Sequence, residues 1–359
     1  MNLDEHKKGD DHLRILLTSV GRRSYLVKYF QEALKNNGEV YVSNSSPLSP
    51  AFITTKKSVV TPLIHDNSYI PFLLAYCKDN KIDVLIPLFD IDLPVLAAHK
   101  HEFIDIGVDV IVSSERVINT CNDKWETYLF CQKNGLHTPK TFLTIESAFQ
   151  AIAKGNLRFP VIIKPRWGMG SIGIFEANDN SELEILYKLV KDRIIRTYLK
   201  NQSFGDQDLI VIIQEKLNGV EYGLDIINDL QGNYQNAIIK QKHAMRAGET
   251  DCAETVVNDN LSQFATKIGQ TLQHVANLDV DVFLVGDTPH LLEMNARFGG
   301  GYPFSHVAGA NLPLAIINWI RGEQVGKELL SVKPGVLAHK DINLVILTPD
   351  ETFNNGGAL

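Results

Sequence analysis

Long apolar runs, paired cysteines and an excess of positive charge are all missing from this sequence of 359 residues. No apolar stretch reaches the roughly 18 residues that a membrane-spanning helix needs, and residues 1–12 contain no apolar signal region. Lys and Arg total 35 against 42 for Asp and Glu, and the net charge of −7 argues against nucleic acid or an anionic membrane as the main partner. We therefore expect a cytoplasmic protein with a disordered N-terminus at residues 1–12.

The four cysteines are scattered and form no CxxC pair. They are Cys77, Cys121, Cys131 and Cys252. This spacing is typical of reduced core thiols and indicates neither a disulfide framework nor a zinc site. With 44% hydrophobic and 21% charged residues, the chain has an ordinary globular composition, and its length predicts roughly two to three domains.

Residues 160–174, with the sequence PVIIKPRWGMGSIGI, combine an apolar strand, a lysine and a glycine-rich loop. The apolar residues before Lys164 have the pattern of a buried strand, and Pro165 is expected to end the strand ladder. The loop glycines free the backbone to direct N–H groups at a phosphate chain, and Lys164 supplies a cation for the same anion. A hairpin loop with a surface lysine has the same pattern, so this stretch alone leaves both interpretations open.

The N-terminal third alternates apolar strands with helical patterns. The expected strands cover residues 13–19, 39–44, 59–63, 82–90 and 111–113. This alternation predicts a small parallel sheet with crossover helices. Residues that follow the strands should lie together beyond the strand ends, where such sheets bind ligands. These residues are Gly21, Arg22, Arg23, Asp90 and Asp92. A substrate-binding role and a structural role both stay open for Arg22 and Arg23.

The rest of the chain mixes helices with longer strands. Helices are expected at residues 114–135 and 144–154, after a capping box of Ser181 and Glu184, and from residue 260. Strands are expected at residues 209–217, 221–229, 234–242, 280–286 and 290–296. The glycine-rich run at residues 297–303 is expected to be irregular.

Five motifs stand in a fixed order, and their order is more specific than any one of them. They are Asp123 with Lys124, IIKPRWGMGSIGI, QEKLNGVEYGLD, KQKHAMRAGET and LLEMNARFGGG. This arrangement resembles the ATP-grasp superfamily, most closely the branch of the carbamoyl-phosphate synthetase large subunit and its single-module relatives.

The resemblance implies an α/β fold, with α+β character in the grasp part. A small parallel-sheet domain at residues 13–115 would precede a two-lobed ATP-grasp domain at residues 116–320, whose nucleotide lid lobe covers about residues 140–215. Residues 321–359 would form a short C-terminal segment, for which the sequence indicates no role.

The same resemblance implies a nucleotide site. Two lysines would hold the phosphates beneath the glycine loop, the strand ending QEKL would meet the adenine, and a carboxylate would take the ribose hydroxyls. The residues concerned are Lys124, Lys164, Gly168, Gly170, Ser171, Glu215, Lys216, Leu217 and Glu221.

A metal site is implied at Asp281, Glu293 and Asn295. Side chains repeat every two residues along a strand, so Glu293 and Asn295 share one face. An all-oxygen site suits Mg²⁺, for which Mn²⁺ can substitute. Relatives often carry Glu or Gln at the position of Asp281, which leaves the ligand set open.

Two cations and two further residues complete the implied site. Arg297 and Lys240 would face the transferred phosphoryl group as catalytic residues. Arg246 and Glu249 would hold phosphate or substrate.

The activity implied is that of an ATP-dependent ligase, which phosphorylates a small-molecule carboxylate and joins the acylphosphate to an amine, releasing ADP and phosphate. Two alternatives stay open: bicarbonate phosphorylation, as in carbamoyl-phosphate synthetase or biotin carboxylase, and a non-catalytic ATP-binding regulator. The expected partners are the small-molecule acid and amine, without nucleic acid or membrane. A homodimer stays open.

Overall fold

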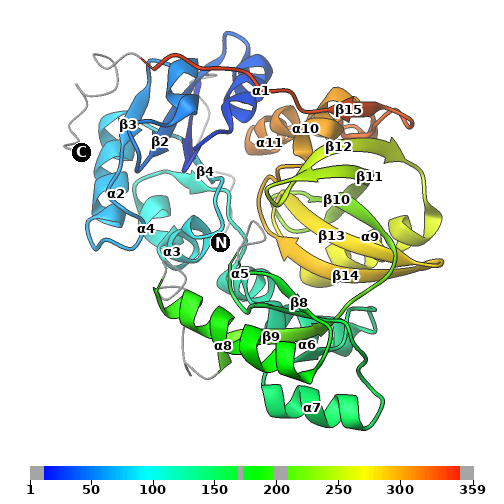
Figure 1. The fold of residues 1–359 in the computed structure, drawn as a ribbon. Helices are drawn as coiled ribbons and strands as arrows, with labels where there is room; N and C mark the ends of the chain where they lie inside the picture. Colours follow the sequence, from blue (N-terminus) through cyan, green and yellow to red (C-terminus); the bar gives the residue numbers. More distant parts are fainter. Residues whose placement is uncertain (1–11, 169–172, 197–208, 348–359) are drawn as a thin grey trace. The chain divides into compact units, whose positions relative to one another are not determined.

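The computed structural model describes residues 12–168, 173–196 and 209–347 (Figure 1). The chain divides into two compact units, which we describe separately. The first unit consists of residues 1–112, 311–329 and 342–359, and the second of residues 113–310 and 330–341. Within the described segments, no helix has the length and apolar character needed to cross a membrane.

The first unit is built on a five-stranded sheet with the order β3-β2-β1-β4-β5. Its strands are β1 (Leu13–Thr18), β2 (Gly38–Asn44), β3 (Ser58–Val60), β4 (Val84–Pro87) and β5 (Asp109–Val110). Its helices are α1 (Ser24–Leu34), η1 (Pro50–Thr54), α2 (Tyr69–Asp79), α3 (Asp92–Ala98), α4 (Lys100–Asp105) and α11 (Leu312–Ile320). Every strand pair is parallel, which confirms the predicted N-terminal sheet. A short 3-10 helix, η4 (Lys327–Leu330), follows α11 in the chain.

Several strand bounds in this unit differ from the predicted ones, and β3 ends at Val60 instead of residue 63. The strand expected at residues 111–113 is β5, which begins at Asp109, although the backbone N–H of Ile111 still donates to the carbonyl of Leu85. The fourth strand was expected to reach residue 90, but β4 ends at Pro87, and helix α3 begins soon after, at Asp92.

The second unit begins with two helices where the sequence predicted one. Helix α5 (Glu115–Asn122) ends and helix α6 (Lys124–Asn134) begins at Asp123, whose backbone is extended. The Asp123 side chain accepts a hydrogen bond from the N–H of Trp125 and so caps α6. The break places Lys124 at the first position of a helix.

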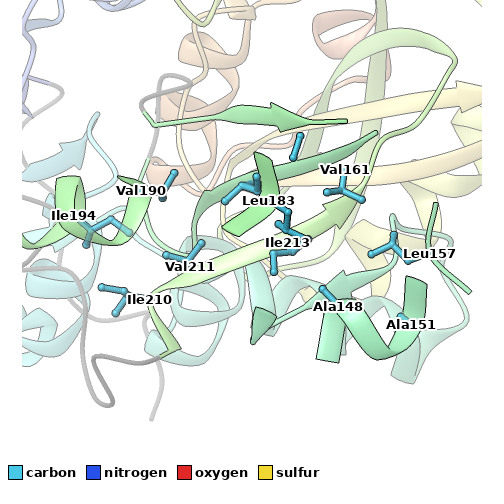
Figure 2. Packing of buried hydrophobic residues seen from close by; sticks show 12 residues of the cluster. Ala148, Ala151, Leu157, Val161, Leu183, Val190, Ile194, Ile210, Val211 and Ile213 are labelled. Carbon is cyan, nitrogen blue, oxygen red and sulfur yellow. The ribbon is translucent and has the colours of Figure 1, made fainter. Parts of the chain in front are cut away.

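A four-stranded sheet with the order β6-β9-β7-β8 forms one part of the second unit. Its strands are β6 (Thr141–Phe142), β7 (Val161–Pro165), β8 (Phe175–Ala177) and β9 (Val211–Glu215), and its helices are α7 (Ile145–Ala153) and α8 (Asn180–Arg196). Figure 2 shows side chains of β7 and β9 packed against those of α7 and α8, among them Val161, Ile213, Ala148 and Leu183. Pro165 still pairs with Val211, so the ladder runs one residue further than expected.

Helix α8 is capped by residues other than those predicted. The N–H of Glu182 donates to Oδ1 of Asp179, and Glu182 accepts from the N–H of Asn178. Asp179 and Glu182 have the same spacing as Ser181 and Glu184, and the helix begins two residues earlier than the second pair requires.

A six-stranded sheet with the order β14-β13-β10-β11-β12-β15 forms the other part of the second unit. Its strands are β10 (Val220–Asn228), β11 (Tyr234–Arg246), β12 (Glu249–Val256), β13 (Asn277–Val285), β14 (Thr288–Asn295) and β15 (Leu337–His339). Helix α9 (Asp259–Leu272) lies against this sheet (Figure 1) and buries Leu261, Phe264, Ile268 and Leu272, as its periodicity predicted.

Two elements of this part of the chain, strand β15 and helix α10, were not predicted from the sequence. Strand β15 pairs with β12 and so ties the segment around residue 338 into the sheet. Helix α10 (Tyr302–Val307) begins inside the run predicted to be irregular, with Pro303 in its first turn, where a missing N–H costs nothing.

Candidate active site

One face of the six-stranded sheet carries oxygen-bearing side chains where β13 and β14 pair. Asp281 lies opposite Glu293, and Asp279 lies opposite Asn295. A β-bulge at Leu292 creates this register, because the extra residue in β14 moves Glu293 onto the face of Asp281. Four such side chains from two strands therefore share one face, which we call the polar face.

The ammonium of Lys242 binds two carboxylates on the polar face. Its Nζ lies 2.7 Å from Oε1 of Glu221 and 2.6 Å from Oδ1 of Asp281. Burial disfavours the charged ammonium, but the two carboxylates outweigh burial and raise the pKa of Lys242. Sequence reasoning assigned no role to Lys242, although it lies two residues from Lys240 and so on the same strand face.

The carboxylate of Asp281 is less acidic than usual. Burial raises its pKa to about 6, the negative charges of Asp279 and Glu293 act in the same direction, and the ammonium of Lys242 opposes them. Crowded carboxylates of this kind favour a bound cation. The donors are all hard oxygens, which fits Mg²⁺.

The protein alone offers few metal ligands here. Among the described residues, no group of three or more His, Cys, Asp and Glu side chains is arranged to hold a metal ion. Two carboxylates and the amide of Asn295 would leave Mg²⁺ with open positions. Mg²⁺ commonly fills such positions with phosphate oxygens and water.

Two buried lysines lie close to this group of carboxylates. The Nζ of Lys124 lies 4.0 Å from Oε1 of Glu293 and donates to the carbonyl of Gly168 at 2.7 Å. Lys164 is 3% exposed, and no hydrogen-bond partner for its ammonium lies among the described residues. Burial lowers the pKa of Lys164 to about 8, the Lys124 charge acts in the same direction, and Glu293 and Asp281 oppose them.

The base of the glycine loop is tied to the start of α6. Arg166 donates from Nε and Nη2 to the two carboxylate oxygens of Asp123 at 2.7 and 2.6 Å, and its guanidinium stacks on Trp167. The N–H of Lys124 donates to the carbonyl of Arg166. These contacts hold Lys124 near the end of the strand that carries Lys164. Gly170 and Ser171 lie outside the described residues.

Comparisons with known proteins agree with this arrangement. Residues 207–339 match the family model described as ATP-grasp in the biosynthetic pathway with Ter operon, and residues 15–111 match a PylC-like N-terminal domain. The chain contains an ATP-grasp domain. The predicted superfamily resemblance is therefore confirmed, and so is the mixed α/β fold class.

Curated relatives and solved structures of ATP-grasp proteins are similar over much of the chain. The carbamoyl phosphate synthase large chain of Campylobacter jejuni is 24% identical over 252 residues, which are 68% of this chain and 22% of that protein. Coenzyme gamma-F420-2:alpha-L-glutamate ligase of Methanocaldococcus jannaschii is 25% identical over 186 residues, 50% of this chain and 59% of that one. The chain thus spans less than two thirds of either relative.

A biotin carboxylase from Campylobacter jejuni, solved as a complex with β,γ-ATP, has the same fold. Its TM-score to this chain is 0.71 at 16% identity, with 89% of this chain and 73% of that chain covered.

Lys240 does not lie open on the polar face of the ATP-grasp domain. It is 2% exposed, and its ammonium binds the carboxylate of Asp225 and the carbonyl of Gly301. Asp225 also accepts hydrogen bonds from Ser305 and Asn277. The charge of Lys240 is thus held by the fully buried Asp225, and a role of Lys240 toward the phosphoryl group stays a prediction.

Arg297 is held by Asp279, a residue that sequence reasoning missed. Its Nη1 donates to Oδ2 of Asp279 at 3.0 Å. Gly299 makes room for this contact, since a Cβ at Gly299 would lie 2.1 Å from Cγ of Asp279. The alternation in the sequence LDVDVFL would have placed Asp279 beside Asp281.

Replacing Gly299 with Ala is therefore expected to lower the free energy of unfolding by about 2 kcal/mol, because Asp279 must move away from the added methyl. Urea denaturation measures this change. Gly300→Ala is the matched control, since its Cβ would meet Glu249 only at an ordinary 3.5 Å. Equal stability of the Gly299→Ala and Gly300→Ala variants would contradict the close packing.

The residues proposed for the adenine lie at and beyond the end of β9. Glu215 ends the strand, and its N–H donates to the carbonyl of Lys140. Lys216 and Leu217 follow outside the ladder, and the Lys216 ammonium lies 2.7 Å from Oε2 of Glu176.

Arg246 and Glu249 face each other at the tip of the β11–β12 hairpin. Arg246 donates twice to Oδ2 of Asp251, at 3.0 and 2.7 Å, and Glu249 accepts from Lys340. Both residues are exposed, and both already have partners, Asp251 on β12 and Lys340 directly after β15.

Arg22 and Arg23 belong to the first unit, at the turn between β1 and α1. Asp92 is fully buried there, and its carboxylate accepts from Thr18 and Tyr69, both at 2.8 Å. Burial raises the pKa of Asp92, whereas hydrogen bonds and the charge of Arg23 lower it. Asp92 therefore has the contacts of a structural residue, and Arg22 is exposed.

Proposed function

We propose that this protein is an ATP-dependent ligase that activates a small-molecule carboxylate as an acylphosphate and joins it to an amine. The observation that carries the proposal is the polar face, where Asp281, Glu293 and Asn295 lie together. Two buried lysines, Lys124 and Lys164, adjoin them. Oxygen ligands for a metal beside cations for phosphates are what phosphoryl transfer requires.

The sequence relatives support a ligase. One of them is a glutamate ligase, and another is a carbamoyl phosphate synthase large chain. A structural neighbour with the same fold was solved with β,γ-ATP, which supports a nucleotide as the ligand of the corresponding region.

The chemistry needs two transfers. A carboxylate oxygen of the substrate attacks the γ-phosphorus of ATP, and ADP leaves. The amine then attacks the acyl carbon, phosphate leaves, and the nitrogen loses a proton. The protein mainly positions these groups and neutralises charge, so it needs no covalent nucleophile.

We assign the phosphates to Lys124, Lys164 and Lys242. Lys242 is preferred to Lys240 because its partner Asp281 is 28% exposed, whereas Asp225, the partner of Lys240, is fully buried. Glu221 would accept the ribose hydroxyls, which places Lys242 between the ribose and the metal ligands. Arg297, oriented by Asp279, would face the transferred phosphoryl group.

Mg²⁺ would be held by Asp281, Glu293 and Asn295. When bound, it would supply positive charge that offsets the negative charge of the phosphates. The same oxygen ligands would also accept Mn²⁺ in place of Mg²⁺.

An ADP-release screen against pooled carboxylic acids and amines tests the proposal. We expect ADP to form only with a matching acid, and mass spectrometry to detect a product equal to acid plus amine minus water. ADP formation with bicarbonate alone would favour the bicarbonate-phosphorylating alternative. Nucleotide binding without ADP formation in any pool, at saturating Mg²⁺, would identify a non-catalytic regulator.

A further inference from the structure

Lys242 reaches across a neighbouring strand to bind Asp281. Lys242 lies on β11 and Asp281 on β13, and both strands flank β10. Neighbouring strands lie about 4.8 Å apart, so the side chains of Lys242 and Asp281 together must bridge about 10 Å across β10. Gly223 lies on β10 opposite Asp281, and a Cβ there would come within 3.3 Å of Cε of Lys242. A glycine at this position keeps the path of the lysine open.

The Lys242 ammonium binds two carboxylates, and the proposed function assigns these carboxylates to two different ligands. Glu221 would bind the ribose, and Asp281 would bind the metal. The Lys242 side chain is 5% exposed, whereas Glu221 and Asp281 are each 28% exposed. The ammonium is thus more enclosed than the carboxylates that it neutralises.

A divalent cation and the Lys242 ammonium compete for the carboxylate of Asp281. The ammonium lies 2.6 Å from Oδ1 of Asp281, and a second positive charge at the same carboxylate would be repelled strongly in this enclosed place. We therefore expect Lys242 to leave Oδ1 of Asp281 when the metal binds. Nucleotide phosphates would give the displaced ammonium new anionic partners.

We propose that Lys242 takes the place of the metal in the nucleotide-free protein, so that metal binding is weak until the nucleotide phosphates accept the Lys242 ammonium. This inference rests on the proposed function. It makes Lys242 the link between the ribose and metal sites. It predicts that removing Lys242 strengthens metal binding and weakens nucleotide binding.

The test is the Lys242→Met variant with two separate binding measurements. Free Mn²⁺ is measured by electron paramagnetic resonance without nucleotide, and ADP binding by calorimetry without metal. We expect Mn²⁺ to bind about tenfold more tightly because its competitor is gone. We expect ADP to bind about tenfold more weakly because its phosphates lose a cation. A purely structural role for Lys242 would weaken both.

Three further variants complete the design. Lys242→Arg keeps the charge and is expected to bind Mn²⁺ as the parent does. Gly223→Val keeps Lys242 but blocks its path, so it is expected to raise Mn²⁺ affinity even if Lys242→Met fails to fold. Lys57→Met removes another paired lysine, which lies 3.5 Å from Glu39 in the first unit, and should change neither affinity.

The outcomes separate this inference from the proposed function. A parent protein that binds no ADP would overturn both. A parent that binds ADP, with Mn²⁺ affinity unchanged or lower in folded Lys242→Met and Gly223→Val variants, would overturn the inference alone.

Discussion

Replacing Glu293 with Gln is expected to lower the rate of ADP formation by about 10³-fold. Glu293 lies opposite Asp281 on the polar face and 4.0 Å from the Lys124 ammonium, so it contributes to both the proposed metal site and the phosphate site. Without its charge, residue 293 would bind the metal more weakly. The positive charge with which the metal neutralises the transition state would then be lost as well. Each factor of ten in rate corresponds to about 1.4 kcal/mol. Steady-state turnover at saturating Mg²⁺ and ATP measures the loss.

The stability of the same variant is expected to stay level or to rise. Glu293 and Asp279 both raise the pKa of Asp281, which reflects repulsion among neighbouring carboxylates in the metal-free protein. Neutralising Glu293 relieves part of that repulsion. Thermal unfolding without metal measures the change.

Glu254→Gln is the matched control for this prediction. Glu254 lies on β12 of the same sheet, where it pairs with His243 at 3.4 Å and has no place in the proposed site. Its replacement should leave turnover near the parent value. Parent-like ADP formation by the Glu293→Gln protein would refute the metal assignment.

The second prediction is that Lys164→Met weakens ADP binding by about 100-fold while the protein remains folded. Lys164 is buried with no hydrogen-bond partner among the described residues, so its ammonium is available to phosphate oxygens. A charge-assisted hydrogen bond to phosphate contributes about 1.5–3 kcal/mol. Calorimetric titration with ADP measures the loss.

Lys188→Met is the control for this variant, because Lys188 is an exposed lysine of helix α8 in the same part of the molecule. It should bind ADP as the parent does. Unaltered ADP affinity in Lys164→Met would mean that the nucleotide lies elsewhere.

The lowered pKa of Lys164 predicts how the stability of the protein depends on pH. Burial lowers the pKa of Lys164 from 10.5 to about 8 in the folded protein without ligand. Between these two values the unfolded chain binds more protons than the folded one, so the stability contribution of Lys164 increases as pH rises from about 8 to about 10.5.

ADP binding should have the opposite slope. Phosphates favour the ammonium form, so binding above pH 8 requires proton uptake by Lys164, and affinity should fall by up to about tenfold per pH unit. Titrations between about pH 7 and pH 9.5 compare the parent with Lys164→Met, which should lack this component. Identical slopes in the two proteins would assign the effect to another group.

The local elements of this chain were predictable because their patterns are short in range. Apolar periodicity located the parallel strands of the first unit and the buried face of α9, and the two-residue period of a strand placed Glu293 and Asn295 together. The prediction of one continuous helix through Asp123 was wrong, and the reason is also local. A capping aspartate competes with helix continuation, and periodicity does not reveal that competition.

The choice between Lys240 and Lys242 was beyond the sequence. Both are lysines on one face of β11, two residues apart. Their difference comes from residues of β10. Asp225 forms an ion pair with Lys240, and the absence of a side chain at Gly223 leaves room for Lys242 to reach Asp281. Partners on other strands are set by strand order and register, which no local pattern records.

By itself, the sequence determined most of the strands and helices, because their patterns depend on residues close together in the chain. It also determined the order of the motifs and the ATP-grasp resemblance, which are read along the chain without knowledge of the fold. Only the tertiary structure decided the composition of the site. An unbroken hairpin would pair Asp281 with Leu292 and turn Glu293 to the opposite face, and the bulge at Leu292 reverses that outcome. A one-residue shift in pairing moves every following side chain across the sheet, so the proposed metal site depends on register, which is settled by the packing of the whole sheet.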